Sequence, residues 1–165
     1  MQVIDNFLYE PDFLSLQDAL IDDGSFPWYF RNSKVSSALD DKHNFQFVHS
    51  FYKEYKPQSQ YIDILAPFFK RVKPLAILRI KANLTVATPE INNYGFHIDG
   101  DSGNIPSKTA VYYVNSNNGY TVFDNGEKVN SVANRMVVFD SKRIHAGTSC
   151  TDAKIRCVIN FNYIQ

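Results

Sequence analysis

The amino-acid sequence predicts a mainly β fold of the α+β class, a sandwich or jelly roll supported by helices near the N-terminus. From about residue 75 onward, short segments rich in Val, Ile, Tyr and Phe alternate with turns rich in Gly, Asn, Asp and Pro. Several short strands at this spacing are typical of sandwiches and jelly rolls. Before residue 73, apolar residues also recur at helical spacing, so this part mixes helices with strands.

Length and composition indicate one globular domain. The chain has 165 residues, of which 44% are hydrophobic and 21% charged, a composition that excludes a disordered chain. No repeat or linker divides it. We therefore expect a single domain over residues 1–165, with mixed helix and strand support at 1–73 and a jelly-roll core at 75–163.

Charge and cysteine content exclude several classes of protein. Lys and Arg number 17, as do Asp and Glu, so the formal net charge is zero, which makes nucleic acid an unlikely partner. No apolar run approaches the ~20 residues that span a bilayer, and the first residues lack the pattern of a secretory signal. Cys150 and Cys157 are too few for a disulfide framework and indicate reduced thiols. We expect a cytoplasmic protein, in a host cell if it is viral, that does not associate with membranes.

The N-terminal part contains four expected elements. Residues 2–4 form a short strand, and a helix follows that begins near Pro11, which a first helical turn tolerates. Alternation of aromatic residues with other residues over 45–51 predicts a strand. A second helical pattern covers residues 61–69, with a kink or a break at Pro67.

The C-terminal part contains seven expected strands. The dipeptide Asn125-Gly126 stands between two of them and is a strong signal for a two-residue hairpin. The expected strands are Leu75–Leu84, Tyr94–Asp99, Thr109–Asn115, Tyr120–Asp124, Glu127–Val132, Arg135–Asp140 and Ile155–Tyr163.

The residues that indicate chemistry begin with the segment Phe96-His97-Ile98-Asp99-Gly100. Alternate residues of a strand point to the same side, so His97 and Asp99 share a face. A third candidate ligand, His145, follows 48 positions after His97. Two histidines and one carboxylate can occupy one face of an octahedron, which leaves positions open for a chelating co-substrate and dioxygen, as non-haem Fe(II) oxygenation requires.

A basic residue, Arg156, lies 11 positions after His145. Alternation places it on the face of its strand opposite to an apolar face that includes Cys157. An arginine fixed in a pocket can bind a carboxylate through two parallel hydrogen bonds. A solvated charge on an edge strand is the alternative, and Lys154 on the same face could share or take the role.

This order of motifs, His-x-Asp, a distal His and a basic residue about ten positions further, resembles the Fe(II)- and 2-oxoglutarate-dependent dioxygenases in their prolyl-hydroxylase-like branch. Small stand-alone members of this kind are common in bacteriophage genomes. The match covers about residues 75–163 well and the N-terminal part loosely. Further similar segments are Val3–Leu8, Thr109–Asn115, Gly119–Phe123 and Ala133–Phe139.

The resemblance implies a double-stranded β-helix, a jelly roll of cupin-like type, with iron at its open end. His97, Asp99 and His145 would be the ligands of Fe(II), and 2-oxoglutarate would chelate the metal as co-substrate. Arg156 would pair with the far carboxylate of 2-oxoglutarate, assisted by Tyr113. With dioxygen, the enzyme would release succinate and CO2 and hydroxylate a peptidyl proline or another peptide or small-molecule substrate.

Three features depart from the family pattern. Arg156 stands 11 positions past the distal His, slightly more than is common. A Tyr often contacts 2-oxoglutarate from the strand before His-x-Asp, and Asn83 is the nearest equivalent in this sequence. The branch that dealkylates nucleic acids carries a second Arg six residues after the first. Asn162 occupies that position, which counts against dealkylation.

Two other functions use the same residues. A non-catalytic jelly-roll module for binding or structure would take up neither Fe(II) nor 2-oxoglutarate. A zinc-dependent hydrolase could use the same three ligands, would need no Arg156, and would not depend on oxygen.

Overall fold

The computed structural model describes residues 1–34, 43–99 and 105–165. In this part of the chain, eleven strands form an eight-stranded and a three-stranded antiparallel sheet. The strands are β1 (Gln2–Ile4), β2 (Tyr29–Arg31), β3 (Gln46–Lys53), β4 (Lys56–Pro57), β5 (Ala76–Val86), β6 (Lys108–Tyr113), β7 (Tyr120–Phe123), β8 (Lys128–Asn130), β9 (Arg135–Asp140), β10 (His145–Gly147) and β11 (Ile155–Ile164).

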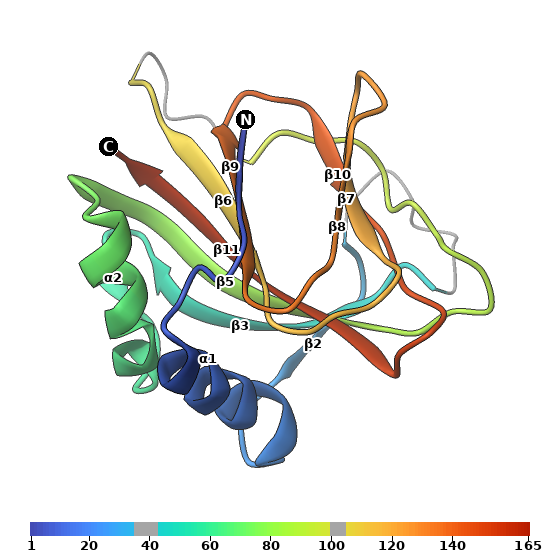
Figure 1. The fold of residues 1–165 in the computed structure, drawn as a ribbon, viewed down its shortest axis with the longest axis horizontal. Coiled ribbons are helices and arrows are strands. Elements are labelled where there is room, and N and C mark those ends of the chain that lie inside the picture. The colour runs from blue at the N-terminus through green and yellow to red at the C-terminus, as the bar shows by residue number, and fades with distance from the viewer. Residues whose placement is uncertain (35–42, 100–104) are drawn as a thin grey trace.

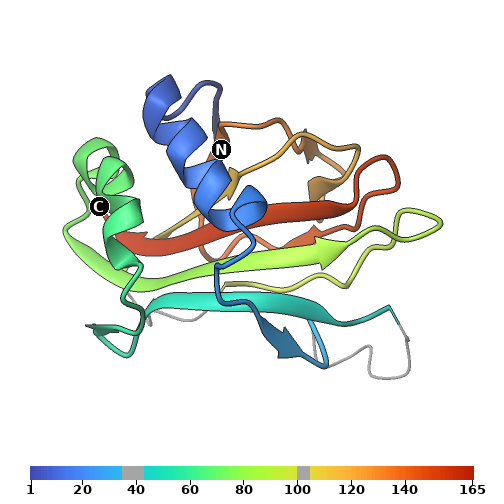
Figure 2. The same ribbon diagram turned by 90° about the horizontal axis from the view of Figure 1, so that it is seen from below.

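The larger sheet has the order β1-β9-β6-β11-β5-β3-β2, with β4 beside β3, and the smaller sheet has the order β10-β7-β8. The smaller sheet lies across one face of the larger sheet (Figure 1). Helices α1 (Glu10–Gln17) and α2 (Ala66–Val72) both lie on the other face (Figure 2). The predicted fold class, mainly β with supporting N-terminal helices, is confirmed.

Strand β11 is central and separates two environments. It pairs with β5 on one side and with β6 on the other. Because side chains alternate along a strand, Cys157, Ile159 and Phe161 pack into the core under the helices, as the sequence pattern predicts. The alternate residues, Arg156 and Val158, face the space between the two sheets.

The core between the large sheet and the helices is aromatic. The ring of Phe68 on α2 packs edge to face on Tyr112 with centroids 4.7 Å apart, and against Phe161 at the same distance. Trp28 packs against this core, and its indole N–H donates to the Leu20 carbonyl at 3.2 Å. Trp28 therefore caps the core and does not line the cavity described below.

The helical predictions hold with altered boundaries. Helix α1 continues as a π-helical turn, η1 (Asp18–Asp22). A 3-10 turn, η3 (Ile62–Leu65), precedes α2. Pro67 lies in the first turn of α2, where its missing N–H costs nothing. The predicted break thus falls at the junction of η3 and α2. No helix in the three described ranges is long and apolar enough to cross a membrane.

Two predictions about strands need correction. The segment 94–99 forms no continuous strand: it makes one isolated bridge, His97 with His145, next to a second between Asn93 and Thr148. The interruption coincides with Gly95, whose φ of 98° is incompatible with a regular strand. The expected strand at 127–132 is shorter, because β8 spans only three residues.

The predicted hairpin has a three-residue connection and not a two-residue one. The Gly126 N–H donates to the Phe123 carbonyl at 2.9 Å, and the Phe123 N–H donates to the Glu127 carbonyl at 2.9 Å. Gly126 has a φ of 83°, as the glycine of a type I turn with a bulge requires.

Cys150 and Cys157 are both buried and unbridged, in agreement with the expectation of reduced thiols. Burial raises the pKa of the Cys157 thiol to about 12, so this sulfur is an unreactive part of the core.

Candidate functional site

The structure brings together the three residues that the sequence singles out as metal ligands. The His97 N–H donates to the His145 carbonyl at 2.9 Å, and the His145 N–H donates back to the His97 carbonyl at 3.0 Å. This reciprocal bridge fixes the two residues as direct neighbours, with ring centroids 4.7 Å apart. One ligand atom from each histidine and one from Asp99 all lie within 4.8 Å of one another.

Backbone carbonyls orient both imidazoles. His97 Nδ1 lies 3.2 Å from the Gly95 carbonyl, and His145 Nδ1 lies 3.0 Å from the Arg143 carbonyl. Because a carbonyl only accepts hydrogen bonds, each Nδ1 carries the hydrogen and each Nε2 keeps its lone pair. The Nε2 atoms of His97 and His145 lie 3.7 and 3.6 Å from the two carboxylate oxygens of Asp99. Both lone pairs are therefore available to a cation beside Asp99.

Asp99 is buried and has one oxygen without a partner. Its Oδ1 accepts a hydrogen bond from Arg79 Nη2 at 3.0 Å, whereas Oδ2 has no hydrogen-bond partner among the residues that the structure describes. An unpartnered buried carboxylate oxygen is costly, and a metal ion bound to Oδ2 would remove that cost. Two imidazole nitrogens and one carboxylate oxygen form a donor set suited to Fe(II), so the residues fit this cofactor.

The ionisation states of these ligands also suit a cation. Burial raises the pKa of Asp99, but the neighbouring His145 and the positive charge of Arg79 lower it by more, so the carboxylate is ionised. Burial and the nearby His145 lower the pKa of His97. His97 is therefore neutral at pH 7 and presents its Nε2 lone pair.

These ligands lie in the wall of a cavity of about 210 Å³ between the two sheets. Arg156 and residues of β5 complete that wall. The lining residues are Lys34, Gln46, Arg79, Lys81, Asn83, Thr85, Tyr94, Gly95, His97, Ile98, Asp99, Val111, Thr121, His145, Gly147, Thr148, Arg156, Val158 and Asn160.

Arg156 is a buried guanidinium that lacks an acidic partner. Only 5% of the residue is exposed. Its Nε donates to Ser131 Oγ at 2.9 Å, and Nη2 lies 3.5 Å from Thr121 Oγ1. No carboxylate in the described ranges forms an ion pair with it, and burial lowers its pKa. A buried charge without a counterion is strongly unfavourable, so a ligand carboxylate in the cavity would stabilise it.

Tyr113 does not line the cavity. Its hydroxyl donates to Thr121 Oγ1 at 2.8 Å and lies 3.3 Å from the Val129 carbonyl, and its ring centroid is 5.6 Å from Arg156 Cζ. The tyrosine packs beside the guanidinium with its hydroxyl already engaged. A direct contact with 2-oxoglutarate therefore stays a prediction. Thr121, which sequence reasoning missed, contributes one of the hydroxyls in the wall.

Asn83 lies in the cavity wall, as a contact with a ligand would require. Its amide nitrogen has only a long 3.5 Å contact with the Lys81 carbonyl. Asn160 lines the same cavity from the neighbouring strand β11. Its buried amide oxygen has no hydrogen-bond partner among the described residues. Both amides therefore have hydrogen-bonding capacity to offer a bound molecule.

Two cations of β5, Arg79 and Lys81, also line the cavity. Burial, followed by repulsion from Arg79, lowers the pKa of Lys81 to about 8. The sequence pattern that could have predicted this polar wall is the alternation of polar residues along β5. It places Arg79, Lys81, Asn83 and Thr85 on one face.

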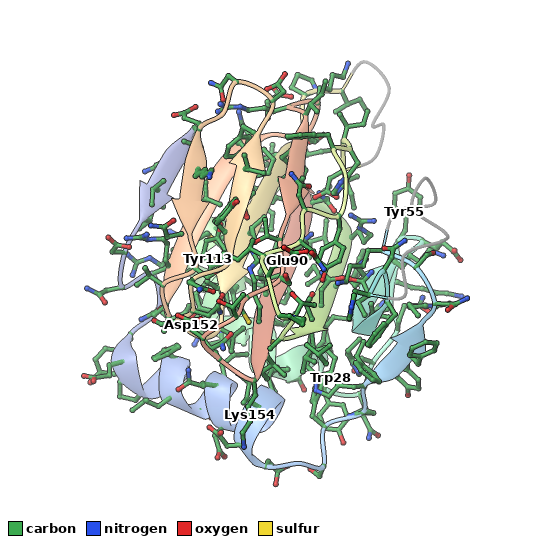
Figure 3. The ribbon with its side chains drawn as sticks, turned by 90° about the vertical axis from the view of Figure 1, so that its right-hand side faces the viewer. Trp28, Tyr55, Glu90, Tyr113, Asp152 and Lys154 are labelled. Atoms are coloured by element: carbon green, nitrogen blue, oxygen red, sulfur yellow. The ribbon has the colours of Figure 1, made fainter. Side chains whose placement is uncertain are left out.

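Lys154 is exposed and absent from the cavity wall. Figure 3 shows it at the end of the sheet, distant from Tyr113 and pointing outward. The alternative in which Lys154 takes the role of Arg156 has no support from its position.

No family model and no curated protein matches this sequence. Solved structures do match over nearly the whole chain. A prolyl hydroxylase from Trichoplax adhaerens, in complex with a peptide fragment of the hypoxia inducible factor oxygen degradation domain, has a TM-score of 0.64 at 14% identity. That match covers 98% of this chain and 82% of the other.

A prolyl-4-hydroxylase from Pseudomonas putida has a TM-score of 0.59 at 14% identity, with 99% of this chain and 92% of the other covered. A viral collagen prolyl hydroxylase from Paramecium Bursaria Chlorella virus-1 has a TM-score of 0.55 at 13% identity, with 99% and 89% covered. A 2OG-Fe(II) oxygenase family oxidoreductase from Burkholderia pseudomallei has a TM-score of 0.60 at 14% identity, with 93% and 78% covered. The chain thus shares its fold with solved structures of prolyl hydroxylases and of a 2OG-Fe(II) oxygenase.

Proposed function

We propose that this protein is an Fe(II)- and 2-oxoglutarate-dependent dioxygenase. The observation that carries the proposal is the pairing of two incomplete groups in one cavity. The carboxylate of Asp99, whose Oδ2 has no hydrogen-bond partner in the described part of the chain, lies beside two imidazole nitrogens. The buried Arg156 has no carboxylate partner there either. A 2-oxo acid with a second carboxylate complements both, because its keto-acid end can chelate a metal while its far end pairs with the guanidinium.

Different residues of the chain would bind the metal and orient the co-substrate. His97, Asp99 and His145 would hold the iron through their Nε2 and Oδ2 atoms. When bound, Fe(II) supplies the activation of dioxygen that couples conversion of 2-oxoglutarate into succinate and CO2 to hydroxylation of a substrate. Arg156 would orient the co-substrate, and the side chains of Val111 and Val158 in the cavity wall would limit access of water.

We infer that the substrate is a peptidyl proline or another peptide or small molecule. The support is the likeness to structures of prolyl hydroxylases, one of which holds a peptide. A zinc hydrolase would leave Arg156 without a role, and a non-catalytic module would leave both Arg156 and Asp99 Oδ2 uncompensated. Neither alternative is favoured.

The test is succinate release from 2-oxoglutarate by the purified protein supplied with Fe(II) and air. We expect slow turnover without a substrate and faster turnover when a substrate is found in a screen of proline-containing peptides. His97→Ala and Asp99→Ala should abolish turnover, whereas Lys142→Ala, an exposed change near His145, should not. Unchanged turnover in the first two variants, or turnover that persists without oxygen, would refute the proposal.

A further inference from the structure

Arg79 connects the large sheet to the carboxylate of Asp99. Its Nη2 donates to Asp99 Oδ1 at 3.0 Å, and its Nε donates to Asn162 Oδ1 at 3.0 Å. Asn162 Nδ2 in turn donates to Thr109 Oγ1 at 2.9 Å. Arg79 and Asn162 are direct cross-strand neighbours, as are Asn162 and Thr109. Three hydrogen bonds thus run across β6, β11 and β5 and end at the candidate metal centre.

Asp99 lies outside the regular strands, two residues after the bridge of His97 with His145 in β10. Among the described side chains, Arg79 is the one that donates a hydrogen bond to its carboxylate. Asn162 and Thr109, in contrast, lie on paired strands and are buried, with exposed fractions of 3% and 0%. The rigid part of the network is therefore the sheet, and Arg79 transmits that rigidity to the carboxylate.

The network also decides which oxygen of Asp99 is available. Arg79 donates to Oδ1, which also lies 3.7 Å from His97 Nε2. Oδ2 lies 3.6 Å from His145 Nε2 and has no hydrogen-bond partner among the described residues. A carboxylate free of Arg79 could rotate and present both oxygens to a cation. A second oxygen on the cation would fill a coordination position that the co-substrate or dioxygen needs.

We propose that Arg79 is a positioning residue of the metal centre, which engages Oδ1 of Asp99 and so leaves Oδ2 as the oxygen available to the ion. Asn162 and Thr109 fix the direction of the Arg79 guanidinium. The inference rests on the proposed function, since it concerns the same three ligands. It assigns to Arg79 a task that depends on its forked geometry as well as on its charge, because one guanidinium donates to Asn162 and Asp99 at once.

The experiment is a titration with Co(II) in place of Fe(II), followed by visible absorption, which reports both affinity and coordination number. We expect the unaltered protein to bind one Co(II). Arg79→Gln should bind Co(II) about 10–100-fold more weakly, the usual cost of removing a group that orients a metal ligand, and its spectrum should change. Arg79→Lys keeps the charge and should not restore the original spectrum.

The matched control is Arg135→Gln, the same chemical change at an arginine that pairs with Asp5 away from the cavity. Its affinity and spectrum should equal those of the unaltered protein. Asn162→Leu, which removes the acceptor that orients Arg79, should shift the spectrum in the direction of Arg79→Gln. This variant and Arg79→Lys decide the question if Arg79→Gln does not fold.

Equal Co(II) affinity and identical spectra in the Arg79 and Asn162 variants would overturn the inference alone. Failure of the unaltered, folded protein to bind Co(II) would instead contradict the proposed function and remove the basis of both.

Discussion

Arg156 holds its charge in a place where the described residues supply only neutral acceptors. Ser131 and Thr121 accept hydrogen bonds from it, and neither can neutralise a guanidinium. We therefore expect Arg156 to contribute strongly to the binding of an anionic ligand. A hydrogen bond to a charged group contributes about 1.5–3 kcal/mol.

We predict that Arg156→Gln raises the KM for 2-oxoglutarate about 10–100-fold, the factor that corresponds to that range of free energy. The measurement is succinate release at varied 2-oxoglutarate concentration. Arg135→Gln, at the surface ion pair with Asp5, should keep the original KM. An equal KM in the unaltered protein, Arg156→Gln and Arg135→Gln would show that the far carboxylate of 2-oxoglutarate is bound elsewhere.

Lys81 gives a prediction about stability and pH. Its pKa of about 8 in the folded protein is below the ordinary 10.5. Between these two values the unfolded chain binds more protons than the folded chain, so the contribution of Lys81 to stability rises with pH. At pH 7 the buried charge is destabilising by on the order of 2–3 kcal/mol.

We therefore expect Lys81→Met to increase the free energy of unfolding at pH 7, and this gain to fade as the pH rises from 8 to 10.5. Urea unfolding at several pH values measures both effects. The exposed control Lys142→Met should show no such trend. A gain that is constant across this pH range would contradict the proposed ionisation of Lys81.

At the scale of elements, the residue before β7, Gly119, lies against the backbone at Ser149 and the side chain of Arg156 on β11. A Cβ on Gly119 would stand 2.5 Å from the Ser149 carbonyl oxygen and 2.8 Å from Arg156 Cδ. The Ser149 carbonyl belongs to the backbone and cannot move away without distorting the chain. The close approach of the backbones at Gly119 and Ser149 therefore requires glycine. The position of the guanidinium thus depends on a glycine in another element.

We predict that Gly119→Ala destabilises the protein by about 1–3 kcal/mol, a typical cost of overpacking, and raises the KM for 2-oxoglutarate because Arg156 is displaced. Gly126→Ala is the control: its φ of 83° is unfavourable for alanine, but its Cβ would meet nothing within 4 Å. It should cost roughly 1–2 kcal/mol and leave the KM unchanged. Urea unfolding and steady-state kinetics test the pair, and an unchanged KM in Gly119→Ala would contradict the coupling.

Across the whole molecule, the site joins parts that the chain keeps separate. His145 belongs to the small sheet and Arg156 to the large one, whereas His97 and Asp99 lie in the segment between β5 and β6, which the bridge at His97 joins to β10. A ligand that contacts all of them links the two sheets and stabilises the folded state by mass action.

We predict that Fe(II) together with 2-oxoglutarate, added without oxygen at about 100 times their Kd, raises the Tm by about 5–10 °C. Thermal unfolding followed by circular dichroism measures this shift. Asp99→Ala should show almost none of it, since the ion would lose a ligand. A similar shift in that variant would place the binding outside the candidate site.

The sequence alone determined the features that depend on periodicity within a strand. Alternation along residues 155–163 separated Arg156 from the core face of β11, because neighbouring residues of an extended chain have fixed relative directions. The motif His-x-Asp with a distal His identified the three candidate ligands, although the segment 94–99 is not a regular strand.

The tertiary structure decided what lies across from each of these residues. Arg79 meets Asp99 and Asn162, and the hydroxyl of Tyr113 is engaged by Thr121, because strand register and loop closure bring together residues that are far apart in the chain. Register depends on the packing of all the strands at once, so no local pattern encodes it. The side chains that could hold a metal were therefore visible in the sequence, whereas the network that orients them was visible only in the fold.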